Sequence, residues 1–365
     1  MIAPDTIPVF DQQHRSVTVC QIGAFHAKTS RTPTNADTLK GTLATLGIES
    51  VCASHHTSRI LRPLDMIWTL CRQRRRFRVV IIHVYSGNAF LWALSSAFVA
   101  RVLGKPLILW LHGGDLPAYS RRHPRLLEFT FRRAIRILAP SNYLKGRLAG
   151  RFAIGLMPYE LPISSYPYRL REQARESLLW VRAFDVCYNP QLAVRVIHIL
   201  RTEFPAVRLV MCGPDNGDGS LQATQSLARS LGVAEAIEIP GKVTKERIKE
   251  LGLAYDIFLN TTDCDNTPVS VIEALAMGMC VVSTDVGGVP ALVEHRVHGL
   301  LVPPGNPEAM ANACREILRQ PEAARRLSTN ARLKADSFDI GVLADAWKRL
   351  IEEIDSGSGC QHLQS

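Results

Sequence analysis

The sequence predicts an α/β protein of two doubly wound, Rossmann-like domains that face each other across a cleft. Short apolar segments of strand length alternate with longer helical patterns in both halves of the chain. Polar residues or glycines follow several of these strands, as at His112-Gly-Gly-Asp115 and at Arg182, where α/β sheets bind ligands. Residues 157–168 hold three prolines and three tyrosines and interrupt the alternation, so we place the domain boundary there.

The first domain is expected over residues 1–160. Its strands are predicted at 17–22, 48–53, 79–84, 106–111 and 135–139, and its helices at 35–46, 89–103 and 141–149. The opening residues 1–10 hold two prolines and an Asp, which does not fit a signal peptide. The longest apolar stretch, residues 89–100, is ended by Arg101 and is too short to span a bilayer.

The second domain is expected over residues 161–338, followed by a separate helix at 339–355. Strands are predicted at 178–181, 209–212, 236–240, 255–260 and 280–283, and helices at 269–277, 307–318 and 339–354. The last ten residues, 356–365, are expected to be a disordered tail.

The charge of the chain is unevenly distributed. Residues 1–160 carry 22 Lys/Arg against 8 Asp/Glu, whereas residues 161–365 carry 21 against 25. A basic first half favours an anionic surface or substrate. Nucleic acid is not expected as a partner, because no recognition motif accompanies the charge. The nine cysteines show no CxxC spacing, which argues against zinc and suits a reducing compartment, so we expect a cytoplasmic protein.

Two arginine-rich stretches of the first half combine apolar and basic residues. Residues 64–78 begin with an apolar part that includes Trp68 and end in five arginines, and residues 121–136 form a second basic amphipathic candidate. Each fits a solvated helix end, and each also fits contact with an anionic membrane surface.

The stretch from Asn260 to Pro290 organises the rest of the chain. A buried strand ends at Asn260, Thr267 and Pro268 are typical of an N-cap followed by proline, and a helix then runs from Val269 to Met277. A helix N-terminus at the carboxyl end of a parallel strand is an anion site. Asp265 and Glu273 frame it, and carboxylates accept hydrogen bonds from sugar hydroxyls. Phosphate together with sugar indicates a nucleotide-sugar.

This stretch reads Asp265-Asn-Thr-Pro-Val-Ser-Val-Ile-Glu273-Ala-Leu-Ala and continues through Val281-Val-Ser-Thr-Asp-Val-Gly-Gly-Val-Pro290. It resembles the donor-site signature of the retaining glycosyltransferases of the GT-B fold, the large family four. In that signature an acid, seven residues and then Glu enclose a proline. The resemblance covers residues 180–320 well and the first half at scattered points. It implies the GT-B architecture, with the final helix and its Trp347 packing back toward the first domain.

The resemblance also implies roles for individual residues. Arg182 stands at the family's arginine position and would clamp the donor diphosphate, while Tyr188 stands at the position of the clamp lysine. Lys242 is the nearest substitute, although a solvated lysine is an equally good interpretation. The remaining assignments are His112 near the reacting sugar carbon, Asp265 orienting the sugar, Glu273 holding the ribose, and Gly23, Asn266, Thr267, Pro268 and Val269 contacting the donor.

Asp263-Cys-Asp265 also mimics the Asp-x-Asp metal clamp of the other glycosyltransferase fold. GT-B enzymes generally bind the donor without metal, so the resemblance implies neither a metal nor another cofactor. The implied function is retaining transfer of a sugar from a UDP- or GDP-sugar to a glycan or lipid-linked acceptor, at the inner face of the cell membrane. A sugar-nucleotide epimerase of the same fold and a non-catalytic nucleotide-sugar-binding subunit remain open alternatives.

Overall fold

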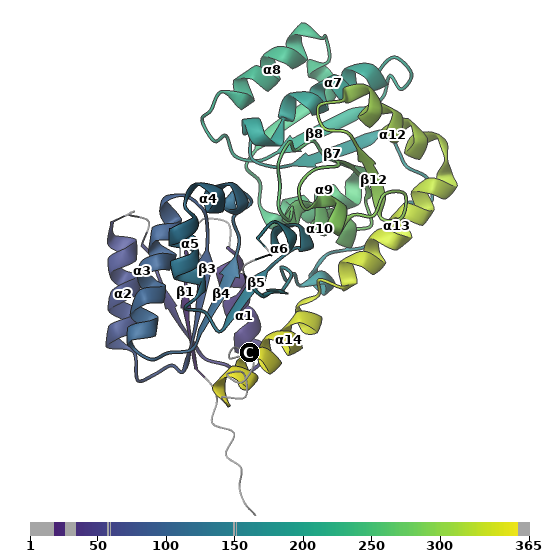
Figure 1. Ribbon diagram of the computed structural model, residues 1–365. Helices are drawn as coiled ribbons and strands as arrows, with labels where there is room; N and C mark the ends of the chain where they lie inside the picture. The colour runs from purple at the N-terminus through teal and green to yellow at the C-terminus, as the bar shows by residue number, and fades with distance from the viewer. Residues whose placement is uncertain are drawn as a thin grey trace, which may run out of the picture.

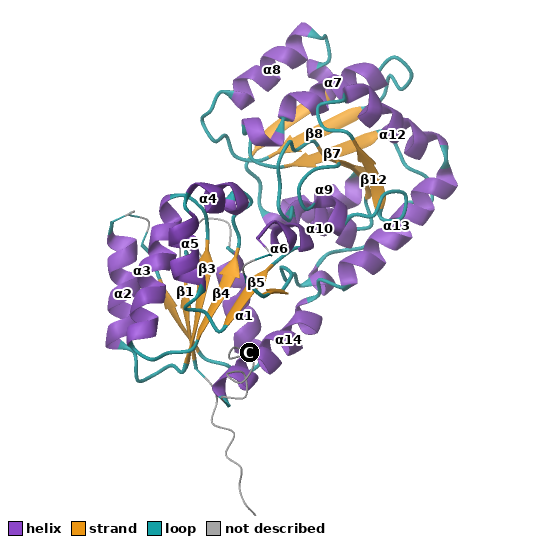
Figure 2. Cartoon of the chain, viewed as in Figure 1, coloured by secondary structure: helices purple, strands orange, loops and turns teal. Residues whose placement is uncertain are grey.

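The computed structural model describes residues 18–25, 34–56, 58, 60–148, 150 and 152–356. They form two lobes, each a six-stranded parallel sheet with helices on both faces (Figures 1 and 2). The strand orders are β2-β1-β3-β4-β5-β6 and β12-β11-β10-β7-β8-β9. The predicted fold of two doubly wound α/β domains is therefore confirmed. Of the tail expected at 356–365, residues 357–365 lie outside the described residues, as do the opening residues 1–17 and residues 26–33 of the first loop.

The first sheet and its helices are formed by the following elements: β1 Val19–Ile22, α1 Asn35–Thr45, β2 Ser50–Ala53, α2 Leu61–Arg72, β3 Val79–Val84, α3 Asn88–Val102, β4 Leu107–Leu111, α4 Leu116–Arg122, α5 Pro124–Phe131, β5 Arg136–Ala139, α6 Asn142–Leu148 and β6 Ile154–Leu156. One apolar core lies between this sheet and α2, α3 and α5. A second core lies on the opposite face, where α1 packs. Burial on both faces explains why these strands are continuous apolar runs.

The second sheet and its helices are formed by β7 Ser177–Val181, α7 Pro190–Leu200, β8 Arg208–Cys212, α8 Ser220–Ser230, β9 Ile237–Gly241, α9 Lys245–Ala254, β10 Ile257–Asn260, α10 Val269–Ala276, β11 Cys280–Thr284, α11 Val289–Leu292, β12 Gly299–Val302, α12 Pro307–Arg319 and α13 Pro321–Asp336. Helices α7 and α12 cover one face of the sheet. Helices α9, α10 and α13 cover the other. The helix expected at 269–277 is therefore present as α10.

Helix α14 (Ile340–Asp355) follows the second domain in sequence but packs on the first sheet. Its Trp347 is fully buried and meets the Trp110 ring of β4 edge to face, with 5.1 Å between the ring centroids. Arg78 and Arg136 of the first domain form ion pairs with Asp355 and Glu353 of this helix. Apolar contact thus attaches α14 to the first domain. Figure 1 shows this helix lying against that domain.

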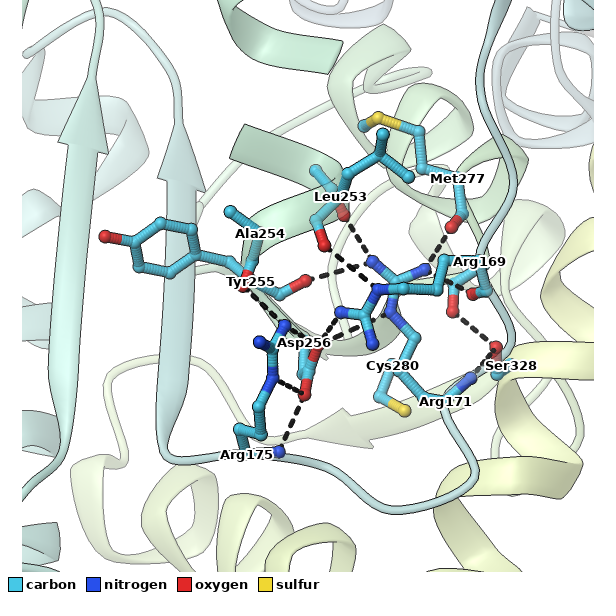
Figure 3. Close-up of polar contacts among 12 residues, drawn as sticks. Arg169, Arg171, Arg175, Leu253, Ala254, Tyr255, Asp256, Met277, Cys280 and Ser328 are labelled. Carbon is cyan, nitrogen blue, oxygen red and sulfur yellow. Dashed lines mark hydrogen bonds and ion pairs between the residues drawn. The ribbon is translucent and has the colours of Figure 1, made fainter. Parts of the chain in front are cut away.

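The segment between β6 and β7 is the linker that joins the two domains. A cluster of three arginines around one buried carboxylate fastens this linker to the second domain (Figure 3). Asp256, which precedes β10, accepts hydrogen bonds from the side chains of Arg169 and Arg175. Arg171 is fully buried and donates to the carbonyls of Tyr255 and Met277, at the ends of α9 and α10. A cation at two helix C-termini is favoured by both dipoles, so the linker is held at the edge of the second sheet opposite the strand carboxyl ends.

The stretch 121–136 is not one amphipathic helix. It is divided into the end of α4, all of α5 and the start of β5. Pro124 follows the break at His123, because proline cannot donate the backbone hydrogen bond that a continuous helix requires. Arg136 lies in β5 and pairs with Glu353, so it belongs to the interface with α14.

The chain crosses between the domains twice, and the two crossings are paired. The Leu161 amide donates to the Phe338 carbonyl at 2.9 Å, and the Ile340 amide donates to the Leu161 carbonyl at 2.9 Å. Glu160 lies beside this pairing and is buried, with the Thr42 hydroxyl donating to its Oε1 at 2.7 Å. Its Oε2 has no hydrogen-bond partner among the described residues. Burial raises the pKa of Glu160 to about 7, although the bond from Thr42 opposes the shift.

This pKa predicts that Glu160 destabilises the protein at high pH. The unfolded chain releases the proton near its ordinary pKa of 4.5, while the folded chain holds it up to about pH 7. Stability is therefore lost as pH rises between these values, by on the order of 3 kcal/mol. Glu160→Gln keeps an acceptor for Thr42 and has no charge. In urea denaturation it should be more stable than the wild type at pH 8 by about 1–3 kcal/mol, and nearly equal to it at pH 4.5.

The exposed Glu235 supplies a matched control, because Glu235→Gln should change stability little at either pH. A difference between Glu160→Gln and the wild type that is the same at pH 4.5 and pH 8 would show that Glu160 does not titrate in this way.

Candidate active site

A cavity of about 820 Å³ lies where β7, β8 and β9 end in the second domain. It is lined by the loops that follow these strands and by the first turns of α9 and α10, including Arg182, Tyr188, Gly213, Lys242, Lys245, Val269, Ser270 and Glu273. The carboxyl ends of parallel strands are where doubly wound folds bind ligands. Of the residues proposed from the sequence, Arg182, Lys242, Val269 and Glu273 lie together in this cavity.

Helix α10 begins beside the cavity without a side-chain cap. Its N-cap residue is Pro268, so the sequence-based assignment of Thr267 as the N-cap is wrong by one residue. The Thr267 hydroxyl is buried without a hydrogen-bond partner among the described residues, as are the Ser270 hydroxyl, Asn266 Nδ2 and Arg182 Nε. Buried polar atoms are nearly always paired in folded proteins. A group of them at an uncapped helix N-terminus therefore indicates a binding site for an anionic ligand.

Two glycines hold the loop before α10 in place. The Gly288 amide donates to the Asp265 carbonyl at 3.0 Å. A Cβ at Gly288 would lie 1.7 Å from the Asn266 carbonyl oxygen, and one at Gly287 would lie 1.9 Å from that of Asp265. Only glycine permits this approach, so the Gly-Gly pair of the sequence signature fixes the position of the loop by direct backbone contact.

Arg182 is a cation just after β7 whose side chain is only 14% exposed. Its guanidinium forms an ion pair with the Asp265 carboxylate, and its Cζ lies 4.5 Å from the centre of the Tyr188 ring. Burial lowers the pKa of Arg182 to about 10, although Tyr188 and Glu273 oppose the shift. The guanidinium is therefore charged at neutral pH. The carboxylate of Asp265, expected to orient a sugar, is engaged with Arg182 in this structure.

Glu273 lies in α10 with its side chain almost fully buried. Its Oε1 accepts a hydrogen bond from the Tyr166 hydroxyl at 2.8 Å and forms an ion pair with Lys245 Nζ. Sequence reasoning missed both partners. Tyr166 lies in the linker and Lys245 begins α9, so they are 107 and 28 residues from Glu273 and no local pattern connects them.

A disulfide joins Cys187 to Cys264, 77 residues apart. The spacing of the nine cysteines suits a reducing compartment, and a separation of 77 residues gives no pairing signal in the sequence. The bond connects the loop after β7 to the loop after β10. Tyr188 and Asp265, the two groups that contact the Arg182 guanidinium, are the residues that follow the two cysteines.

His112 follows β4 in the first domain and is buried in a polar network. Its Nε2 lies 2.9 Å from His83 Nδ1, and its Nδ1 lies 3.1 Å from the Tyr159 hydroxyl. Burial and the neighbouring His83 keep the pKa of His112 well below its ordinary value, so the ring is neutral. Tyr85 stacks on the ring with 5.0 Å between the centroids. His112 is not among the residues that line the cavity, and both its ring nitrogens have protein partners.

Gly23 also lies in the first domain, behind this network. A Cβ there would lie 3.0 Å from the His83 ring, so the structure gives Gly23 a packing role beside the proposed ligand role.

The two domains meet at Asn266, whose Oδ1 accepts a hydrogen bond from the Ser141 hydroxyl at 2.5 Å. A Cβ at Gly114 would lie 3.6 Å from the Asn266 backbone nitrogen. The His-Gly-Gly loop therefore reaches the start of α10 through Gly114.

Family models match both domains of the chain. The model described as "Glycosyl transferases group 1" matches residues 170–334, which include the cavity. The model described as "Glycosyltransferase Family 4" matches residues 29–155.

Curated relatives are similar over part of their length. A D-inositol 3-phosphate glycosyltransferase from Streptomyces griseus is 30% identical over 212 residues, which are 57% of this chain and 42% of the relative. A putative teichuronic acid biosynthesis glycosyltransferase, TuaC from Bacillus subtilis, is 27% identical over 270 residues, 69% of this chain and 65% of the relative. The chain thus spans less than two thirds of the length of either relative.

The whole fold matches a solved structure. The crystal structure of HepE from Anabaena in complex with UDP has a TM-score of 0.73 and 16% identity, and the match covers 93% of this chain and 100% of that one. With both domains matched by glycosyltransferase family models and the two-domain fold shared, the chain belongs to the group 1 glycosyltransferases of the GT-B fold.

Proposed function

We propose that the protein is a retaining glycosyltransferase that moves a sugar from a UDP- or GDP-sugar to a glycan or lipid-linked acceptor in polysaccharide or glycolipid synthesis. The proposal rests on the group of buried polar atoms around the uncapped start of α10 that have no hydrogen-bond partner in the described part of the chain, beside the cation of Arg182. Hydroxyl, amide and guanidinium donors at a helix N-terminus suit the phosphates of a nucleoside diphosphate.

The transfer reaction needs the positive charge of Arg182 and the partial positive charge at the start of α10. The bond between the sugar carbon and the diphosphate oxygen breaks, and the diphosphate leaves with the electron pair. The acceptor hydroxyl oxygen bonds to the same carbon, from the face that the leaving group vacates, and its proton passes to the departing diphosphate oxygen. Arg182 and the start of α10 stabilise the negative charge that develops on the departing diphosphate, because their dipoles and charge are fixed before the reaction.

The proposed roles of the two acids differ. Glu273 holds the ribose hydroxyls, which its burial beside the cavity allows. Asp265 fixes the orientation of the Arg182 guanidinium and contacts the sugar with the rest of its carboxylate. A sugar contact by His112 requires its ring to exchange a bond to His83 or Tyr159 for one to the ligand. The donor is bound without a metal ion, so the charge on the diphosphate is met by the protein alone.

The reaction is tested with purified protein, a panel of UDP- and GDP-sugars, and glycan and lipid-linked acceptors. We expect release of the nucleoside diphosphate that depends on the acceptor. The glycosidic product should keep the anomeric configuration of the donor, as measured by proton NMR. EDTA should leave the rate unchanged. Loss of activity in EDTA with recovery in manganese would overturn the metal-free proposal, and an inverted product would overturn the retaining mechanism.

Site variants connect this activity to the cavity. Glu273→Gln should chiefly raise the donor KM, and Asp265→Asn should chiefly lower kcat, each by about ten- to a hundredfold for one lost bond to a charged partner. The matched control is Asp263→Asn. Asp263 is exposed, accepts from Asn189 at 3.1 Å, and should be replaceable without effect.

One alternative is favoured by a specific observation. Tyr188 provides no amine for a diphosphate clamp, and Asp265 is paired with Arg182, so a subunit that binds nucleotide-sugar without turning it over also fits the site. Nucleotide binding with no transfer to any acceptor would support that subunit. Free, epimerised sugar formed without acceptor would support the epimerase.

We also propose that the first domain contacts an anionic membrane. Seven large apolar residues on or just before α2 and α3 are exposed, namely Ile60, Leu61, Leu64, Trp68, Leu91, Phe98 and Val102. The two helices lie side by side on the outer side of this domain (Figure 1). Arg72, Arg74, Arg75 and Arg76 follow at the end of α2. Apolar side chains beside arginines fit the interface of an anionic bilayer. Among the described helices, none has the length and apolarity needed to cross a bilayer.

Flotation with liposomes tests this contact. The wild type should float with vesicles that contain anionic phospholipid, and less so with zwitterionic vesicles or at high salt. The double variant Leu64→Ser, Trp68→Ser should bind at least tenfold more weakly, because it removes apolar contact. Leu333→Ser, which changes an exposed leucine of α13 in the second domain, is the matched control. Equal flotation of the double variant and the wild type would rule out this face.

A further inference from the structure

The cavity contains a lysine that neither the family signature nor sequence reasoning identified. The resemblance places a diphosphate-clamping lysine at position 188, but the residue there is Tyr188, whose ring lies against the Arg182 guanidinium. Lys242 and Lys245 line the same cavity as Arg182. Lys245 Nζ forms an ion pair with the buried Glu273, whereas no ion pair joins Lys242 to any other described residue.

The position of Lys245 is unfavourable for a cation without such a partner. It is the first residue of α9, whose start is fixed by the Thr244 hydroxyl accepting from the Arg247 amide at 3.2 Å. A positive charge in the first turn opposes the helix dipole. The lysine is therefore held there by Glu273, which itself would be a costly unpaired charge without it.

Glu273 Oε1 is shared between two donors of unequal mobility. The Tyr166 hydroxyl donates to it from a residue that is 7% exposed and packed in the core. The Lys245 side chain is 38% exposed and extends on a flexible stem. A ribose that hydrogen-bonds to Glu273 competes for the same carboxylate. Of its two present partners, Lys245 is the one that can leave.

We propose that Lys245 is a second cation of the donor diphosphate site and that nucleotide binding moves its ammonium group from Glu273 to the phosphates. This inference rests on the proposed function. The ribose hydroxyls take the place of the ammonium on Glu273, and the diphosphate replaces Glu273 as the anionic partner of Lys245. After the move the Glu273 carboxylate accepts hydrogen bonds from Tyr166 and the ribose, and the Lys245 ammonium donates to the phosphates, so both groups keep hydrogen-bond partners. Lys245, in α9, thus supplies the ammonium group for the diphosphate that Tyr188, in the loop after β7, cannot supply.

The test compares ligands that differ only in phosphate number. Binding of UDP, UMP and uridine, with GDP, GMP and guanosine in parallel, is measured by calorimetry at fixed ionic strength. Lys245→Met should weaken binding of the diphosphate by about ten- to a hundredfold, the monophosphate less, and the nucleoside not at all. Lys249→Met, one turn later on the same helix, is the matched control. Lys249 lies over the Tyr166 ring and contacts Ser165, so its replacement should leave all three affinities unchanged.

A second comparison separates binding of phosphate from support of Glu273. If Lys245 acts only by neutralising Glu273, the effect of Lys245→Met on diphosphate binding should vanish in a Glu273→Gln background. The proposal predicts that the effect persists there. A loss that is equal for diphosphate, monophosphate and nucleoside, or one that vanishes in that background, overturns the role of Lys245. Failure of the wild type to bind any of the nucleotides instead overturns the proposed function.

Discussion

The buried charge of Arg182 is the constraint on which the active site depends. A guanidinium removed from water needs an anion and hydrogen-bond acceptors close by, or it strongly destabilises the fold. Among the described residues, the Asp265 carboxylate forms an ion pair with the Arg182 guanidinium and the Tyr188 ring lies against it. The Cys187–Cys264 bond joins the residues just before these two groups, and Gly287 and Gly288 fix the Asp265 loop by backbone contact. The Nε donor has no hydrogen-bond partner among the described residues, which leaves capacity for a ligand anion.

The same elements that hold the cavity also connect the two domains. Asn266 receives a bond from Ser141, and Gly114 of the His-Gly-Gly loop approaches its backbone. Farther from the cavity, His112 bonds to Tyr159 beside the hinge, and Trp110 packs on Trp347 of α14. The loop before α10 and the segments where the chain crosses between the domains are therefore connected through β4 and the loop that follows it.

Local sequence patterns predicted the parts of this structure that depend on neighbours in the chain. The apolar run from Val269 and the glycine at 278 correctly predicted α10, and strands ended by polar residues predicted the fold class. The contacts that could not be predicted from the sequence join residues that lie far apart in the chain. Lys245 with Glu273, Cys187 with Cys264, and Arg171 with the helix ends around Asp256 meet only after the second domain has folded. The prediction of one amphipathic segment over residues 121–136 followed from its continuous pattern of arginines. It failed because Pro124 begins a new helix and so divides the stretch.

We propose that a nucleoside diphosphate binds between Arg182 and the start of α10. Hydrogen–deuterium exchange of backbone amides, followed by mass spectrometry with and without saturating UDP or GDP, tests it most directly. Slower exchange with the nucleotide is expected in peptides that cover residues 182–189, 242–246 and 266–273, with no change in α8 or α12. Bound nucleotide that leaves exchange over residues 266–273 unchanged, and slows it elsewhere, would contradict the account.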